Sequence, residues 1–252
     1  MKPEEPTNED RAQELLYDAY EAEPEHAVSL VRQVLKLDPD NADAYLLLAD
    51  LAYASDTTLA LDYARKGVAA GKRRIGKKFR SLRGQFWGFL ETRPYMRAKL
   101  ECATLLYELD RIDECLAEYA ELIELNPLDN QGNRYPYASV LVESGRWKEY
   151  AELQERYAEE SSAMWLFPYA LYRFKTEGDT PVSLEALRQA DLANAHVIPL
   201  LLREVEPEED LLKDYYSPGD ETEALTYLHW GVHGWLDDAA ALEWLSAYRL
   251  SS

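Results

Sequence analysis

Residues 71–78 come close to a loop that binds phosphate through glycine amides and a lysine. The stretch reads Gly-Lys-Arg-Arg-Ile-Gly-Lys-Lys. A nucleotide-hydrolysing enzyme needs Ser or Thr directly after the lysine to hold Mg²⁺, and a β-strand before the loop. Here Lys78 follows Lys77, and the preceding residues 57–69 have helical periodicity. The sequence therefore predicts no NTPase site at this position.

Two histidines and two cysteines have spacings that could hold a metal or provide a nucleophile. His229 and His233 are one helical turn apart, as two ligands of a zinc site would be. No third ligand is evident and Trp230 follows His229, so packing against tryptophan is favoured over zinc. Cys102 and Cys115 lie in neighbouring helical patterns, where core packing is favoured. Because the sequence also lacks G-x-S-x-G, H-E-x-x-H and C-x-x-C motifs, we expect no catalytic residues, no metal, no cofactor and no enzyme.

A compact basic segment interrupts an acidic sequence. The chain has 252 residues, of which 27 are basic and 47 acidic, and a formal charge of −20. Residues 72–83 contain a candidate basic docking patch and no acidic residue. The patch consists of Lys72, Arg73, Arg74, Lys77, Lys78, Arg80 and Arg83. Two interpretations stay open. Either the patch is a solvated basic loop or one paired with acids of the same protein, or it docks an acidic partner segment, a phosphorylated ligand or nucleic acid, in that order of preference.

The composition is typical of a globular protein in a reducing compartment. Hydrophobic residues make up 47% of the chain, which is enough for a core. The acidic balance argues against general nucleic-acid binding, which needs a cationic face. The longest apolar run, 163–172, contains Pro168 and is half the length of a membrane span of about 20 residues. Residues 1–25 hold nine acids and no apolar stretch, so we expect no signal peptide and, with two cysteines, a cytoplasmic location.

Helices must position these side chains, because the periodicity of the chain is helical nearly throughout. Pro39, between Asp38 and Asp40, ends one such helix because proline cannot continue it and the aspartates favour turns. Apolar stripes with helical spacing occur in residues 12–20, 27–37, 42–53, 57–69, 221–235 and 237–248. The segments follow one another as pairs joined by short turns.

These pairs resemble the tetratricopeptide repeat, a 34-residue unit with small residues where its two helices cross and a proline at its end. Ala27 and Pro39 keep the family's spacing of twelve, and Cys115 and Pro127 repeat it. Further positions that carry the resemblance are Ala60, Ala64 and Gly67, the turn 125–130, the helix start 145–150, and Trp165, Tyr169 and Tyr172.

Residues 84–249 resemble, more closely, an uncharacterised bacterial family of tetratricopeptide type. The matching blocks are 84–88, 91–98, 126–132, 214–216, 219–221 and 223–224. The resemblance implies a helical-repeat fold and names no activity.

The resemblance also implies a concave groove lined by the first helix of each pair, where polar residues bind peptides. The candidate groove residues are Arg97, Asn133, Arg134 and Tyr137. One known version of the fold clamps the terminal carboxylate of a peptide with Lys, Asn and Arg, and Arg97, Asn133 and Arg134 offer matching chemistry. The alternative for Asn133 is a role in capping or in a turn.

We therefore predict one all-α domain over residues 1–252, a right-handed α-solenoid of about five or six helix-turn-helix pairs. Its parts are two pairs at 8–70, a basic aromatic insert at 71–93, further repeats at 94–203, an acidic loop at 204–220 and a C-terminal capping pair at 221–252. The preferred function is a non-catalytic scaffold that binds a protein or peptide. One alternative is a regulatory module that contacts nucleic acid or another acidic ligand through 72–83. Another is a self-associating structural protein, in which the acidic loop of one copy docks on the basic insert of another.

Overall fold

The computed structural model describes residues 5–206 and 215–251. Its contacts divide the chain into two compact units, Met1–Asn133 and Arg134–Ser252, and each unit is described by itself. The predicted acidic loop at 204–220 lies partly outside the described residues, since 207–214 are not among them. The prediction of a single continuous domain stays a prediction.

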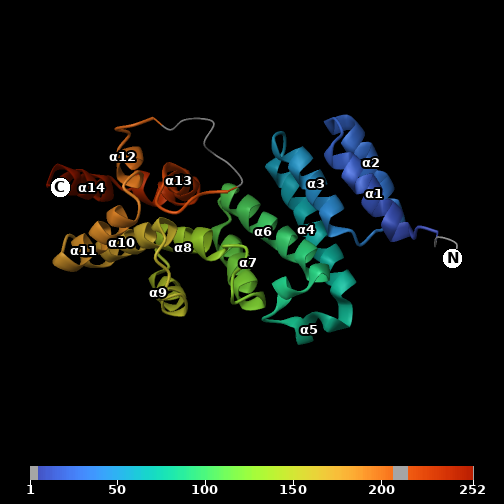
Figure 1. Cartoon of the computed structure of the whole chain (residues 1–252), viewed down its shortest axis with the longest axis horizontal. Coiled ribbons are helices and arrows are strands. Elements are labelled where there is room, and N and C mark those ends of the chain that lie inside the picture. The colour runs from blue at the N-terminus through green and yellow to red at the C-terminus, as the bar shows by residue number, and fades with distance from the viewer. Residues whose placement is uncertain (1–4, 207–214, 252) are drawn as a thin grey trace. The chain divides into compact units, whose positions relative to one another are not determined.

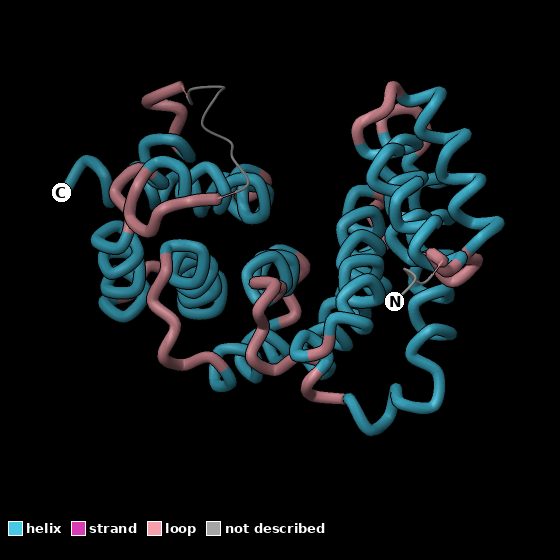
Figure 2. Tube along the Cα trace, turned by 45° about the vertical axis from the view of Figure 1, so that its right-hand side comes forward, coloured by secondary structure: helices cyan, strands magenta, loops and turns pink. Residues whose placement is uncertain are grey.

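Both units are built from helix pairs, and the described residues contain no β-strand (Figures 1 and 2). The all-α, helix-pair fold is confirmed. The helices of the first unit are α1 (Asn8–Tyr20), α2 (Pro24–Leu37), α3 (Ala42–Tyr53), α4 (Thr57–Ile75), α5 (Phe79–Leu82), α6 (Arg93–Glu108) and α7 (Ile112–Leu125). The helices of the second unit are α8 (Arg134–Glu143), α9 (Trp147–Arg156), α10 (Ala163–Glu177), α11 (Pro181–Ala193), α12 (Val197–Leu201), α13 (Glu221–Leu236) and α14 (Ala239–Ser251).

Short polar side chains begin several of the helices, because they accept hydrogen bonds from amides that have no partner within the helix. The Thr7 hydroxyl and the Asp10 carboxylate form a reciprocal pair at the start of α1. The Asn41 side chain caps α3 by accepting from the Ala44 amide, and the Asp56 carboxylate caps α4 by accepting from the Leu59 amide. The helix α2 ends at Leu37, directly before the Asp-Pro-Asp turn, as the sequence predicts.

Small residues on α4 let it lie close to both neighbouring helices, α3 and α6. Ala60, Ala64 and Gly67 are buried, which confirms the packing role predicted from their spacing. Gly71 continues this stripe one turn further. A Cβ atom placed on Gly71 would lie 2.8 Å from the Cβ and 2.9 Å from the Cα of Tyr95 on α6. The backbones of α4 and α6 therefore cross where only a glycine fits.

The predicted insert after the second pair is ordered by aromatic packing. The helix α4 runs on to Ile75, and short 3-10 turns with α5 connect it to α6. Phe79, Phe86 and Tyr95 form a cluster in which the Phe79 ring lies 4.9 Å from that of Phe86 and 5.3 Å from that of Tyr95. The Thr92 hydroxyl donates to the carbonyl oxygens of Phe86 and Phe89. The segment is thus fixed against α6.

In the second unit the helix α13 packs across α8 and α10, which are the first helices of their pairs. The Tyr227 ring of α13 stacks on Phe167 of α10 at 5.4 Å, and the Trp235 indole donates to the Tyr227 hydroxyl at 2.7 Å. A Cβ on Gly234 would lie 3.1 Å from Leu171 of α10, so the helices approach closely. The helices α9 and α13 lie on opposite sides of α8 (Figure 1). The chain therefore covers the first-helix face of its own second unit with α13.

In the described parts of the chain, no helix combines the length and the apolar character that a membrane crossing needs.

Candidate functional site

A groove with an apolar floor lies along the first helices of the three pairs in the first unit. We call it the α3–α6 groove, and its volume is about 330 Å³. It is lined by Tyr20 of α1, by Leu46, Leu47 and Asp50 of α3, and by Arg97, Leu100 and Glu101 of α6. Asp50 follows Leu46 and Leu47 by four and three residues, and Leu100 and Glu101 follow Arg97 by three and four, so the members on each helix share one face. This is the surface on which the sequence predicts a peptide-binding groove.

Arg97, a predicted groove residue, does line this groove, but an acid of the same unit holds its side chain. Its Nε and Nη2 atoms donate to Asp43 Oδ1 at 3.0 and 2.8 Å, and Nη2 also donates to Asp43 Oδ2 at 2.7 Å. Two-point contacts of this type fix the plane of the guanidinium. Arg97 therefore ties α6 to α3, and its charge is compensated before any peptide arrives.

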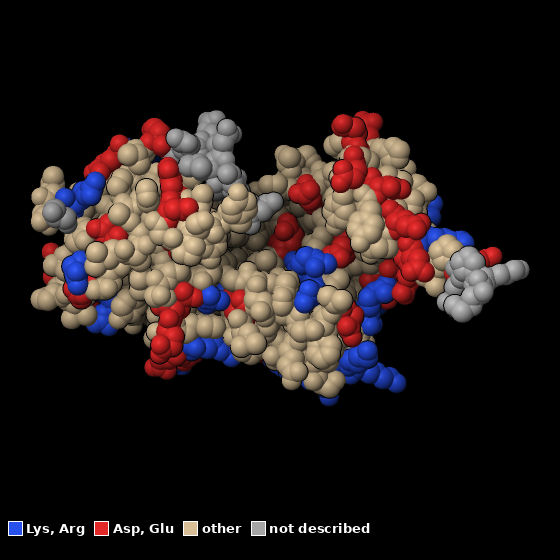
Figure 3. Space-filling view, in the orientation of Figure 1, with Lys and Arg blue, Asp and Glu red and all other residues tan. Residues whose placement is uncertain are grey.

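The remaining charged groups of the groove are acidic. Burial, reinforced by the charges of Asp50 and Glu108, raises the pKa of Glu101 above its ordinary value. The Glu108 carboxylate accepts a hydrogen bond of 2.7 Å from the Tyr53 hydroxyl. No ion pair neutralises Asp50 or Glu101 within residues 5–206 and 215–251. Figure 3 shows acidic side chains gathered on the α1–α3 side of this unit and basic ones along its lower edge near α5.

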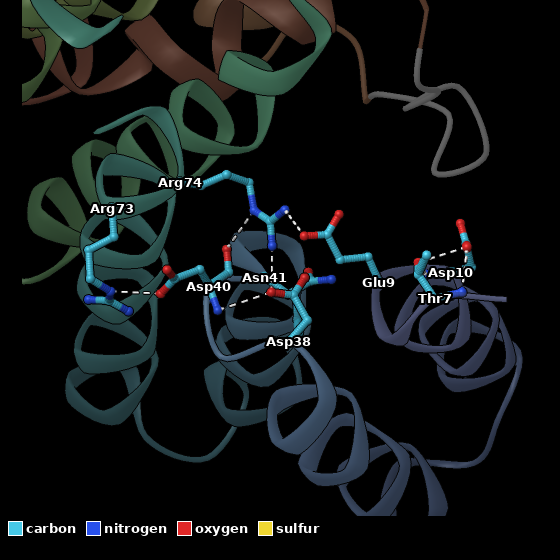
Figure 4. Close-up of polar contacts among 9 residues, drawn as sticks. Thr7, Glu9, Asp10, Asp38, Asp40, Asn41, Arg73 and Arg74 are labelled. Atoms are coloured by element: carbon cyan, nitrogen blue, oxygen red, sulfur yellow. Dashed lines mark hydrogen bonds and ion pairs between the residues drawn. The ribbon is translucent and has the colours of Figure 1, made fainter. Parts of the chain in front are cut away.

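The basic patch is partly neutralised by acids of its own unit, and Figure 4 shows how its first arginines are held. Arg74 binds the Asp38 carboxylate, donates to the carbonyl oxygen of Asp40 at 3.3 Å, and reaches Glu9 of α1 at 3.3 Å. Arg73 donates to the Asp40 carboxylate at 2.7 Å. These two arginines fasten the end of α4 to the turn before α3.

The other members of the patch divide into paired and unpaired side chains. Lys78 lies 3.6 Å from Glu91, and Arg83 pairs with Glu124. Lys72 lies over the Phe79 ring at 5.4 Å. Across the described ranges, Lys72, Lys77 and Arg80 are exposed and have no ion pair. Four side chains of the patch are therefore paired with acids of the same protein. The other three, Lys72, Lys77 and Arg80, remain accessible to a ligand, so both interpretations of the patch keep a structural basis.

Two of the other predicted groove residues, Asn133 and Arg134, have contacts within their own units. The Asn133 amide donates to Asp129 at 2.8 Å, and its side chain is buried. Arg134 donates to the Glu160 carboxylate at 2.9 and 2.6 Å, and its guanidinium lies over the Tyr135 ring. Tyr137 is half-buried. The backbone amide of Asn133 thus takes part in the turn at Asp129, and Arg134 holds the start of α8 to the loop before α10.

The two cysteines are buried, and one of the two paired histidines packs against a tryptophan. Cys102 and Cys115 are buried thiols. Burial, together with the charge of Glu118, raises the pKa of Cys102 to about 12, so it stays protonated at neutral pH and is a poor nucleophile. The His229 ring packs edge-on against Trp230 at 4.8 Å. Over residues 5–206 and 215–251, no group of three or more His, Cys, Asp and Glu side chains is placed to hold a metal ion.

Lys99 is a buried cation that sequence reasoning did not single out. Its side chain is 3% exposed, and Nζ donates to Glu118 and, at 2.6 Å, to Glu121. Burial acts to lower the pKa of Lys99, but the hydrogen bonds and charges of Glu118 and Glu121 outweigh it, so the net pKa is raised. Only the turn between α6 and α7 brings these side chains together, which is why their spacing in the sequence gives no signal.

Replacing Lys99 with methionine is expected to lower the free energy of unfolding by about 1–3 kcal/mol, because two carboxylates lose their buried cation. The pKa of Lys99 in the folded protein is raised above the ordinary 10.5. The stabilisation by the Lys99 cation is therefore fully present below pH 10.5 and is lost as the pH rises through the folded pKa. Chemical denaturation at several pH values between 7 and 11 measures the difference. Lys36→Met, at an exposed lysine of α2, is the control. A difference between Lys99→Met and the native protein that does not shrink at high pH contradicts this account.

Comparison with known proteins identifies the fold and goes no further. No protein-family model matches the chain, and no curated protein matches it. A solved structure, that of YrrB, is similar over 73% of this chain and 83% of its own, with a TM-score of 0.50 and 20% sequence identity. YrrB is described as a TPR protein with an unusual peptide-binding site. At this identity the likeness is one of fold.

Proposed function

Since the chain has a tetratricopeptide-type fold, we propose that the protein is a non-catalytic scaffold that binds a segment of a partner protein or peptide in the α3–α6 groove. The observation that carries this proposal is the open groove itself, with Leu46, Leu47 and Leu100 in its floor and charged side chains around them. Concave sites that combine apolar surface with a few polar groups are the usual binding sites of proteins. The peptide-binding site named for YrrB supports the same class of function.

We propose that this scaffold works in the cytoplasm, where its two buried cysteines would remain thiols.

A photo-crosslinking amino acid in place of Leu46 tests the proposal in the native cell. Leu46 is half-buried in the groove, so a bound segment must contact it. We expect a discrete set of crosslinked partners, identified by mass spectrometry. The matched control places the same amino acid at Asp62, an exposed position on α4, the second helix of the same pair. Equal products from both positions, or none from position 46, would overturn the proposal.

A second candidate function rests on the exposed side chains of Lys72, Lys77 and Arg80, which would dock an acidic ligand. If these three side chains neutralise three phosphates, the logarithm of the binding constant should fall with the logarithm of the salt concentration with a slope of about −3. This slope is shallow for a protein that binds duplex DNA. Binding that is unchanged in a Lys77→Glu/Arg80→Glu variant excludes this candidate.

Self-association through the acidic loop at 204–220 stays a prediction, because residues 207–214 lie outside the described residues. Light scattering at low and at high salt tests it. A monomer under both conditions contradicts it.

A further inference from the structure

The second unit shows, within this chain, what a first-helix face of this protein accepts. The face formed by α8 and α10 is occupied by α13, a helix of 16 residues. Tyr227 and Trp235 of α13 are buried against α10, where Phe167 lies 5.4 Å and 6.5 Å from their rings. The occupant is thus a helix that inserts large apolar side chains between the first helices of two successive pairs.

The corresponding face of the first unit, formed by α3 and α6, has the same position in the repeat but keeps a groove. Its floor of Leu46, Leu47 and Leu100 offers apolar surface to side chains like those of α13. Tyr20 of α1 lines the groove and is 53% exposed. Tyr17, three residues earlier on the same face of α1, is 64% exposed.

The charges around this floor differ from those of a neutral helix-binding face. Arg97 is compensated by Asp43, so among the described residues the groove lining keeps two acids without an ion pair, Asp50 and Glu101, and Glu108 lies further along α6. Like charges at a half-buried site repel one another, and the repulsion falls when a cation is bound between them. The groove therefore selects against an acidic segment and against a free terminal carboxylate.

We propose that the α3–α6 groove binds a basic amphipathic helix of a partner protein, with leucine-type side chains on the apolar floor and a lysine or arginine between Asp50 and Glu101. This inference rests on the proposed scaffold function and specifies its ligand. The long stem of a lysine or arginine would cover Leu47, Leu100 and Tyr20, while its charged end reaches the carboxylates. To place its apolar side chains on the groove floor, the bound helix must have apolar residues at positions i, i+3, i+4 and i+7.

Fluorescence anisotropy with three designed 18-residue peptides tests the proposal. The first is a basic amphipathic helix of leucine, alanine and lysine. The second has glutamate in place of every lysine, and the third has the composition of the first with a central proline that breaks the helix. We expect the first peptide to bind at least tenfold more tightly than either of the others, and its affinity to fall with added salt.

A matched pair of variants locates the binding. Asp50→Asn/Glu101→Gln removes two charges from the groove with little change of volume, and it should weaken the basic peptide by about five- to tenfold. Asp62→Asn/Glu155→Gln removes two charges from exposed positions on α4 and α9 and should leave the affinity within about twofold of the native value, because distant surface charges are screened.

Three outcomes overturn the proposal: equal binding of the basic and acidic peptides, equal binding of the proline peptide, or equal loss in the two charge variants. Its failure is distinguishable from that of the scaffold function. If crosslinking from position 46 still captures a partner through an extended or acidic segment, the scaffold stands and the helix specificity is wrong. If position 46 captures no partner, both are wrong.

Discussion

Replacing Glu223 with alanine is expected to lower the free energy of unfolding of the second unit by about 3–5 kcal/mol, since it leaves several buried donors without an acceptor. Glu223 is 1% exposed. Its carboxylate accepts hydrogen bonds from the amide of Ala163 at 3.1 Å, from the side chain of Asn194 at 3.0 Å and from the amide of Gly219 at 2.7 Å. One side chain of α13 therefore joins the start of α10, the end of α11 and the turn before α13.

Unfolding in denaturant, followed by tryptophan fluorescence, measures this loss, because five of the six tryptophans lie within residues 134–252. Glu223→Gln keeps the shape and one acceptor oxygen, so it should cost less than Glu223→Ala. Glu221→Ala, at a half-buried acid in the same first turn of α13, should cost less than about 0.5 kcal/mol. If the two alanine variants are equally stable, Glu223 does not hold these segments together.

Replacing Gly71 with alanine is expected to destabilise the first unit by about 1–3 kcal/mol, the range for a methyl group forced into a packed contact. At an unconstrained helical site, a change from glycine to alanine stabilises the helix by up to about 1 kcal/mol. At Gly71 we expect the opposite, a loss of stability. The reason is that the new Cβ would lie 2.9 Å from the backbone Cα of Tyr95 and 2.8 Å from its Cβ, and a change of rotamer moves neither atom. The helix α6 must then move away from α4.

Hydrogen exchange of the α4 and α6 amides, read by mass spectrometry, detects this separation as faster exchange. Because α6 carries Arg97, Leu100 and Glu101, we expect the same variant to weaken binding in the α3–α6 groove. Gly88→Ala is the control, since a Cβ at Gly88 has no atom within 4 Å. Native exchange rates in Gly71→Ala contradict the close approach of the two helices.

The helix pairs could be predicted from the sequence because each depends on neighbouring residues. Apolar stripes recur at helical spacing, Pro39 ends α2, and the small residues Ala60, Ala64 and Gly67 mark a close crossing. All of these signals lie within one or two turns of the structure they specify.

The details of the sites depend on distant residues, and the sequence could not supply them. Arg74 is compensated by Asp38 and Glu9, which lie 36 and 65 residues away. Glu223 is one of 47 acids, and nothing in its local pattern indicates burial. The helical period of α13 predicts an apolar face but not that this face would cover α8 and α10. Arg97 was identified as a groove residue from its helix, but its partner Asp43 is on another one.

The path of α13 also sets an order for synthesis. The helices of the first unit pack mainly on neighbours in the sequence, such as α3 on α4 and α6 on α7, so that unit can fold while later residues are still being translated. The helices α8 and α10 have to wait for α13, which begins at Glu221, before their shared face is covered. During that interval Phe167 and its apolar neighbours would be accessible to chaperones, and slower translation of residues 178–236 would lengthen the exposure.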